Sequence, residues 1–217
     1  NNYIKFNNEM WRIISIGADN TIKIMRNESI GDMAFDTTGG TYGNNNWDRP
    51  ADIKTYLNDT YFPTITTNHD KIVSHTWSIG KIEVANTNLA NQVNDENGTQ
   101  SQTASVGMIT SSEFLRANTN TRLCASWRFS DENYTTCKTT NWMYNIVLSG
   151  NNLWTISHVY GQGRSVVYMV GGTSSFSLIM NYNDANSSKG ISPVLYLTSD
   201  ITLSGTGTEK DTYVITN

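Results

Sequence analysis

The side chains that most often perform catalysis are few in this 217-residue chain, and their spacing matches no common active site. The three histidines, His69, His75 and His158, lie far apart, and none belongs to an HxxxH or HExxH pattern that would hold zinc. The chain also lacks the GxSxG turn of serine hydrolases and the GxxxxGK[ST] loop that cradles phosphates. We therefore expect a protein that is not an enzyme.

The two cysteines, Cys124 and Cys137, flank the polar insert ASWRFSDENYTT. A cysteine pair across a short loop is typical of a disulfide in an exported protein. A metal site is disfavoured, because two thiols without a nearby histidine cannot complete a tetrahedral shell. We predict a disulfide that restrains a surface loop in an oxidising compartment, with two free thiols as the alternative.

Aromatic and small polar side chains are concentrated between Leu153 and Leu197. Three apolar runs in this stretch, LWTIS, SVVYMV and SPVLYL, are separated by connectors rich in Gly, Ser and Asn. Aromatic rings provide contact area at low entropic cost, and Ser and Asn provide adaptable hydrogen bonding, so the combination favours recognition over catalysis. The predicted ligand-binding residues are Ser157, His158, Tyr160, Arg164, Ser165, Tyr168, Ser174, Phe176 and Tyr182.

Several members of this set have a plainer interpretation. Tyr168, Phe176 and Tyr182 could instead pack in the core. Arg164 is typical of a solvated surface charge. Because their neighbours are small and polar, we expect the segments Ser157–Tyr160, Ser165–Tyr168 and Thr173–Tyr182 to deliver exposed residues to one end of a sheet.

Apolar periodicity predicts the strands that must position these residues. Residues 3–26 are typical of three consecutive antiparallel strands that turn at Asn7-Asn8 and at residues 17–20. The three apolar runs of the C-terminal third and VGMIT (residues 106–110) predict core strands. The final DITLSGTGTEKDTYVIT predicts a hairpin.

Two short helices are predicted among these strands. The first begins at Asp48, carries Pro50 in its first turn and ends near Asn58. The second runs from Ser111 to about Ala117, with Ser111 or Thr110 as its cap. Residues 81–105 are polar and predict a loop or a short helix. Their Asp95–Gly98 offers oxygen ligands, so we leave a calcium ion there open beside a solvated turn, although a calcium loop needs a longer alternation of donors.

Composition narrows the classes of partner and compartment. Charged residues make up 16% of the chain, the net charge is −4, and no run of Lys or Arg exists to displace counterions, so we expect no nucleic-acid partner. No apolar run approaches the length of a bilayer span. A polar, weakly charged surface is typical of extracellular adhesins, although a low-GC genome would also enrich Asn, Ile and Lys.

The chain has no internal repeat and no strong linker, so we expect one domain over residues 1–217. It opens directly on the strand pattern NNYIKF. We therefore expect it to be part of a longer protein, with any export signal or anchor upstream.

The order of several motifs resembles a known family. These motifs are NNYIKFNNEMWRIISI, TIKIMRNESIG, ADIKTYLN, VGMITSSEFLRA, LWTIS and GISPVLYLTSDITLSGTGT. Together they resemble secreted or surface proteins, mostly of Firmicutes and their phages, that carry a C-type lectin-like domain. The resemblance covers nearly the whole chain and implies an α+β fold of two short helices, antiparallel sheets and long loops. At Gly190–Pro193, Ser192 replaces the arginine usual in this fold, so roles tied to that arginine do not carry over.

The same fold serves calcium-dependent sugar lectins, calcium-free protein binders, formylglycine-generating enzymes and variable proteins of diversity-generating retroelements, so the fold alone does not select a function. The Glu-Pro-Asn and Trp-Asn-Asp tripeptides of the sugar lectins are absent, and Asn45–Asp48 has similar chemistry in another order, which we interpret as a helix cap. Formylglycine-type oxidation needs reactive thiols in a cleft, whereas the two cysteines of this chain bracket a polar loop. We expect an extracellular recognition domain without a cofactor, displayed on a bacterial surface, a pilus-like structure or a phage particle. Its partner would be a protein or glycan, and its C-terminal loops could be diversified by a retroelement.

Overall fold

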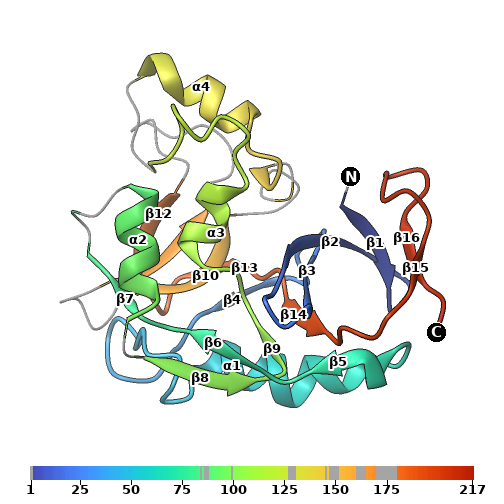
Figure 1. Cartoon of the computed structure of the whole chain (residues 1–217). Helices are drawn as coiled ribbons and strands as arrows, with labels where there is room; N and C mark the ends of the chain where they lie inside the picture. Colours follow the sequence, from blue (N-terminus) through green and yellow to red (C-terminus); the bar gives the residue numbers. More distant parts are fainter. Residues whose placement is uncertain are drawn as a thin grey trace.

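Two large β-sheets and a small third sheet form the framework of this computed structural model (Figure 1). The architecture is a mixed α+β fold with few helices, as the sequence predicted at this coarse level. The structure describes residues 2–83, 85, 88–98, 100–126, 131–144, 146, 152–159, 165–169 and 180–217.

Sheet A has eight strands and is built around the N-terminal meander. Asn7 and Asn8 both have positive φ, 50° and 60°, which is the backbone of a tight hairpin turn between the first two strands. The predicted three antiparallel strands and the C-terminal hairpin are confirmed. In order across the sheet, the strands are β15 (Leu203–Ser204), β16 (Tyr213–Ile215), β1 (Tyr3–Phe6), β2 (Glu9–Ile16), β3 (Ile22–Arg26), β14 (Val194–Leu197) and β5 (Ile72–Val73), with β9 (Val106–Gly107) also paired to β14.

Sheet B has six strands and contains the segment in which the ligand-binding residues were predicted. Its central strand, β10, is antiparallel to β11 and parallel to both β13 and β7. The strands, in order, are β12 (Met180–Asp184), β11 (Ser165–Met169), β10 (Leu153–Val159), β13 (Ser188–Gly190) and β4 (Asp32–Ala34), with β7 (Lys81–Ile82) also on β10. The small sheet C pairs β6 (His75–Ser78) with β8 (Ser101–Ala104).

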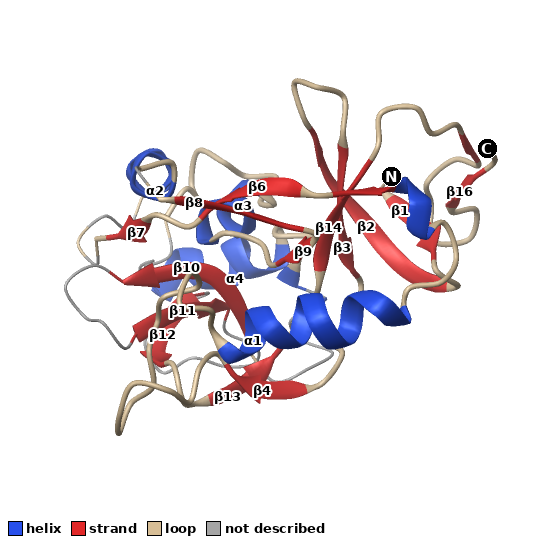
Figure 2. Cartoon of the chain, turned by 90° about the horizontal axis from the view of Figure 1, so that it is seen from below, coloured by secondary structure: helices blue, strands red, loops and turns tan. Residues whose placement is uncertain are grey.

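The first predicted helix exists but its limits were wrong. Helix α1 (Asp52–Thr55) starts four residues after Asp48 and continues as wide π turns (Tyr56–Tyr61) and a 3-10 turn (Phe62–Thr64), making one long helical run (Figure 2). Asp48 is not its cap, because Ala51 holds the cap position three residues later, and the Asp48 carboxylate instead accepts a hydrogen bond from the Gln102 side chain. A further 3-10 turn spans His69–Lys71.

The second predicted helix is confirmed, a short helix left open beside a loop is present, and one further helix was missed. Helix α3 (Ser111–Arg116) is capped by Thr110 and Glu113, whose side chains each bond the other's backbone amide. Helix α2 (Leu89–Glu96) lies in the stretch predicted as a loop or short helix. Helix α4 (Asp131–Thr139) lies in the cysteine-flanked insert, where a loop was predicted. The estimate of two helices was therefore too low.

The core is rich in aromatic side chains, as composition indicated. Phe6 and Trp11 meet edge to face at 5.8 Å in sheet A. Phe35 lies between Trp47 and Trp154, at 6.1 and 6.2 Å between ring centroids, and thereby joins the loop after β4 to β10. All five rings are buried, so a continuous apolar layer supports both large sheets.

Candidate functional site

Strand β10 is the rigid centre of the candidate site. All seven of its residues are buried, including the polar Thr155, Ser157 and His158. The indole of Trp154 donates a hydrogen bond to the carbonyl of Met33, which links β10 to strand β4 of the same sheet. A strand buried over its full length positions its neighbours accurately, because core side chains occupy single packed arrangements.

Ser157 belongs to a buried cluster of polar groups where α2, α3 and β10 meet (Figure 1). The Oε1 atom of Glu96 accepts hydrogen bonds from Ser111 Oγ at 2.5 Å, from Ser157 Oγ at 2.6 Å and from the Ser112 amide at 3.1 Å. The Ser111 amide in turn donates to Ser157 Oγ at 2.9 Å. The carboxylate thus ties both helices to the central strand with charge-assisted bonds.

The expectation that Ser157 and His158 are exposed is wrong. Each has only 1% of its surface accessible; the Ser157 hydroxyl bonds Glu96, and His158 lies in the paired part of β10, beside Lys81 of β7. Burial, reinforced by the positive charge of Lys81, lowers the pKa of His158 to about 4, so its ring is neutral near pH 7. No described residue bonds its Nδ1 atom. A ligand-binding role for the two residues stays a prediction.

The other predicted ligand-binding residues follow along β11 and β12. Ser165 and Tyr168 lie in β11, opposite Asp184 and Asn181 of β12, but their side chains lie outside the described part of the structure. Tyr182 is half-buried on β12 and packs against the core with part of its ring. Strand β12 as a whole presents Asn181, Tyr182, Asn183 and Asp184 in succession, all half-exposed. Tyr160, Arg164, Ser174 and Phe176 lie outside the described residues.

A second concentration of charged groups lines a cleft of about 250 Å³ between sheet A, sheet C and α3. Lys23 is buried there and donates to Glu113 Oε1 at 2.6 Å, with its ammonium near the rings of Trp77 and Tyr196. Burial alone would lower the pKa of Lys23, but the Glu113 carboxylate and the Tyr196 hydroxyl outweigh it, so the pKa is raised and the lysine stays protonated. A protonated, paired lysine is not a nucleophile.

The aromatic side chains that line this cleft already pack against one another. His75 stacks on Tyr196 at 3.7 Å between ring centroids, and Trp77 meets Tyr196 edge to face at 5.1 Å. Burial and the nearby Glu113 raise the pKa of Tyr196 in spite of Lys23. The Trp77 ring also packs on Gly107, where any side chain would collide with the indole. These contacts link sheet A to sheet C across the cleft.

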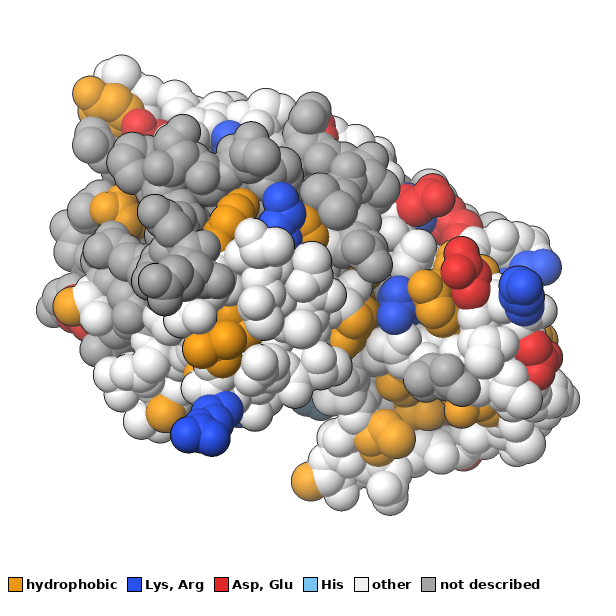
Figure 3. Space-filling model, turned by 90° about the horizontal axis from the view of Figure 1, so that it is seen from above, with side chains coloured by type: hydrophobic (Ala, Val, Ile, Leu, Met, Phe, Trp, Pro, Cys, Tyr) orange, Lys and Arg blue, Asp and Glu red, His pale blue; other side chains and the backbone are white. Residues whose placement is uncertain are grey.

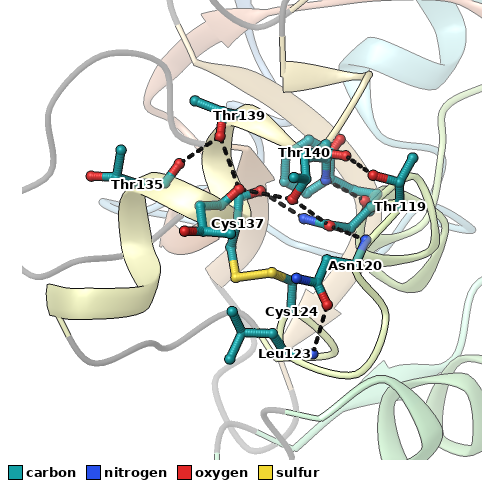
Figure 4. The surroundings of a disulfide bond; sticks show 12 residues. Thr119, Asn120, Leu123, Cys124, Thr135, Cys137, Thr139 and Thr140 are labelled. Carbon is teal, nitrogen blue, oxygen red and sulfur yellow. Dashed lines mark hydrogen bonds between the residues drawn. A yellow bond between two sulfur atoms is a disulfide. The ribbon is translucent and has the colours of Figure 1, made fainter.

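The cysteine pair forms the predicted disulfide, which closes a 13-residue separation (Figure 4). Asn118 and Asn141, both buried, attach this unit to the end of α3. Asn118 Nδ2 donates to the Cys137 carbonyl at 2.6 Å, and Asn141 Nδ2 donates to the Phe114 carbonyl at 2.7 Å.

Seen from above, the surface is hollowed between the part that carries α4 and the part that carries β1 and β2 (Figure 3).

The calcium candidates do not converge on a common point. In Asp95–Gly98, Glu96 points inward to the serines, whereas the Asp95 carboxylate accepts the Glu83 amide at 3.0 Å. Asn46 accepts the Asp48 amide, so the second candidate stretch forms its own turn. Within the described ranges, no group of three or more His, Cys, Asp or Glu side chains could hold a metal ion.

Two of the organising residues were missed by sequence reasoning. Glu96 was considered only as a calcium ligand in a solvated turn, and nothing local to it indicates that two serines, 15 and 61 residues away, reach its carboxylate. Lys23 had a usable signal, because it interrupts the apolar run TIKIMR in a predicted strand.

Comparison of the chain with family models, curated proteins and solved structures gives no match. None of the helices in the described parts of the chain has the length and hydropathy needed to cross a bilayer.

Proposed function

We propose that the chain is an extracellular, non-enzymatic recognition module that binds a protein or glycan through side chains at the β11–β12 end of sheet B. The observation that carries this proposal is the sequence of four half-exposed polar and aromatic residues on β12, in the same sheet as the wholly buried central strand β10. A rigid sheet that carries polar and aromatic side chains at one end meets what a preorganised binding surface requires.

The remaining parts of the proposal rest on the sequence and on supporting features. The disulfide suits an exported protein, since disulfides persist in oxidising compartments. The mixed α+β architecture is compatible with the C-type lectin-like fold that the motif order resembles. We further propose display on a bacterial surface or phage particle, with retroelement-driven variation of the C-terminal segment as an extension of that resemblance.

Paired variants in a binding screen test this proposal. The wild-type protein would be applied to glycan and host-protein arrays, and each ligand found would be titrated against Tyr182→Ser and the control Tyr213→Ser. Both tyrosines are half-buried on strands, but Tyr213 lies in sheet A, away from β12. We expect Tyr182→Ser to weaken binding at least tenfold, with about 1 kcal/mol of lost stability, and Tyr213→Ser to leave affinity unchanged.

Equal effects of the two variants on affinity would contradict the proposal. Repeating the titration in EDTA separates the metal-dependent alternative, since a calcium-dependent sugar lectin would lose its affinity there, whereas we expect none to be lost. Turnover of any array ligand would instead place the chain among enzymes.

A further inference from the structure

A lysine, a glutamine and an aspartate from three separate segments form a chain of hydrogen bonds. Lys54 of α1 donates from Nζ to Oε1 of Gln102 on β8. The Nε2 atom of Gln102 donates in turn to Oδ1 of Asp48, in the turn before α1. Lys54 and Gln102 are half-buried, and Asp48 is exposed. The side-chain amide of Gln102 thus lies between an ammonium and a carboxylate.

The charges on either side determine how this amide is oriented. An amide oxygen accepts hydrogen bonds and an amide nitrogen donates them, so the oxygen faces the ammonium and the nitrogen faces the carboxylate. The reverse orientation would oppose two donors at one end and two acceptors at the other. A cation at the carbonyl oxygen withdraws electrons from Cδ and stabilises the oxyanion that forms when a nucleophile adds to that carbon.

The same contact brings a nucleophile to the carbonyl carbon. Cδ lies about 1.23 Å from Oε1, so an amine that bonds Oε1 is also next to Cδ. A lysine attacks a carbonyl group only after its ammonium has lost a proton. Burial lowers the pKa of Lys54, although the carboxylates of Asp48 and Asp59 oppose this shift. A larger share of the amine is therefore unprotonated than in a fully solvated lysine.

We propose that Lys54 and Gln102 join in an isopeptide bond within the chain, with Asp48 as the group that transfers protons. The Nζ–Cδ bond forms and the Cδ–Nε2 bond breaks. The two protons that the ammonium loses pass through the Asp48 carboxylate to Nε2, which leaves as an ammonium ion, and the carboxylate is regenerated. No further reactant is needed. The reaction occurs once per chain, so it is a maturation step and not enzymatic turnover.

The product would join the helical run that begins with α1 to sheet C. It would span a separation of 48 residues, whereas the disulfide spans 13. A link that closes a longer loop removes more entropy from the unfolded chain. The cross-link does not depend on what the chain binds, so a failed ligand screen would leave it unaffected.

Mass spectrometry of the purified full chain tests the cross-link. We expect the intact mass to be lower than that of the disulfide-bonded sequence by one ammonia molecule, and a digest to contain joined peptides that hold Lys54 and Gln102. Lys54→Arg should retain the full mass, because a guanidinium stays protonated and cannot attack. Asp48→Asn keeps an acceptor oxygen without the charge and should reduce the cross-linked fraction at least tenfold. The matched control Lys71→Arg, in the 3-10 turn before β5, should lose ammonia as the wild type does.

A wild-type chain that retains its full mass, even after prolonged incubation at pH 9, would overturn the inference. So would a loss of ammonia that persists in Lys54→Arg, since it would then come from another site, such as a succinimide at Asn97-Gly98. The joined peptides are detected in the wild type itself, so a variant that fails to fold still leaves a decisive result.

Discussion

The cleft around Lys23 and the end of sheet B around His158 differ in whether their buried polar groups have partners. In the cleft, the ammonium has a carboxylate at 2.6 Å and two aromatic rings, and Glu113 also caps α3. In sheet B, His158 Nδ1 is buried without a partner among the described residues, and so is Nε2 of Gln92 on the neighbouring helix α2. Buried polar groups normally find partners, and exceptions call for an explanation.

The contrast assigns a different role to each region. A fully matched cluster that joins β3, β6, β14 and α3 stabilises the fold, and its rings and charges are already engaged. Sheet B keeps an unpartnered imidazole nitrogen on its buried central strand β10, and its end strand β12 carries four half-exposed residues. The comparison thus separates a region that holds the architecture from one that presents side chains.

The largest expected effect comes from breaking the matched region. Lys23→Met leaves the Glu113 carboxylate without its cation, and removal of one partner from a buried ion pair costs about 3–5 kcal/mol. Urea denaturation would measure the change in the free energy of unfolding. The double variant Lys23→Met/Glu113→Gln should recover part of the loss. A loss below about 1 kcal/mol in the single variant would show that the pair does not hold the sheets together.

The disulfide should have the next largest effect, on the unit that contains α4. Cys124→Ser/Cys137→Ser opens a loop of 13-residue separation, for which the chain-entropy model gives about 3 kcal/mol. Thermal unfolding of this variant, and of the wild type with and without reductant, would measure it. Identical unfolding in all three samples would mean that the hydrogen bonds of Asn118 and Asn141 are sufficient to hold the insert.

Acidification should destabilise the fold mainly through the buried His158 of sheet B. The pKa of His158 is about 4 in the folded protein and about 6.5 when unfolded, so below pH 6.5 the unfolded state binds the proton more readily. Stability is therefore lost as the pH falls from 6.5 toward 4, by about 2.5 kcal/mol at pH 4.5. The free energy of unfolding would be measured at pH 7 and at pH 4.5 for the wild type and for His158→Gln. The drop between the two pH values should be smaller in the variant by about that amount. Equal sensitivity of both proteins would mean that the histidine is not the cause.

The sequence predicted those parts of the fold that depend on local patterns. Strand alternation, the Asn7-Asn8 turn and the Thr110 cap act within a few residues, and all are confirmed. Helix α4 escaped prediction because its residues, DENYTTCKT, have weak intrinsic helix preference. The Glu96 cluster escaped it because the partners of Glu96 come from two distant elements, α3 and β10. Alternation alone also could not show that Ser157 and His158 face inward, since β10 is buried on both sides.

The most direct test of the recognition surface is NMR chemical-shift mapping with a ligand found on the arrays. Amide shifts would be followed during titration into the isotopically labelled wild-type chain. The proposed function predicts the largest changes at residues 180–184, with little change around Lys23 and His75. Changes concentrated in that cleft, with β12 unaffected, would contradict the assignment of recognition to sheet B.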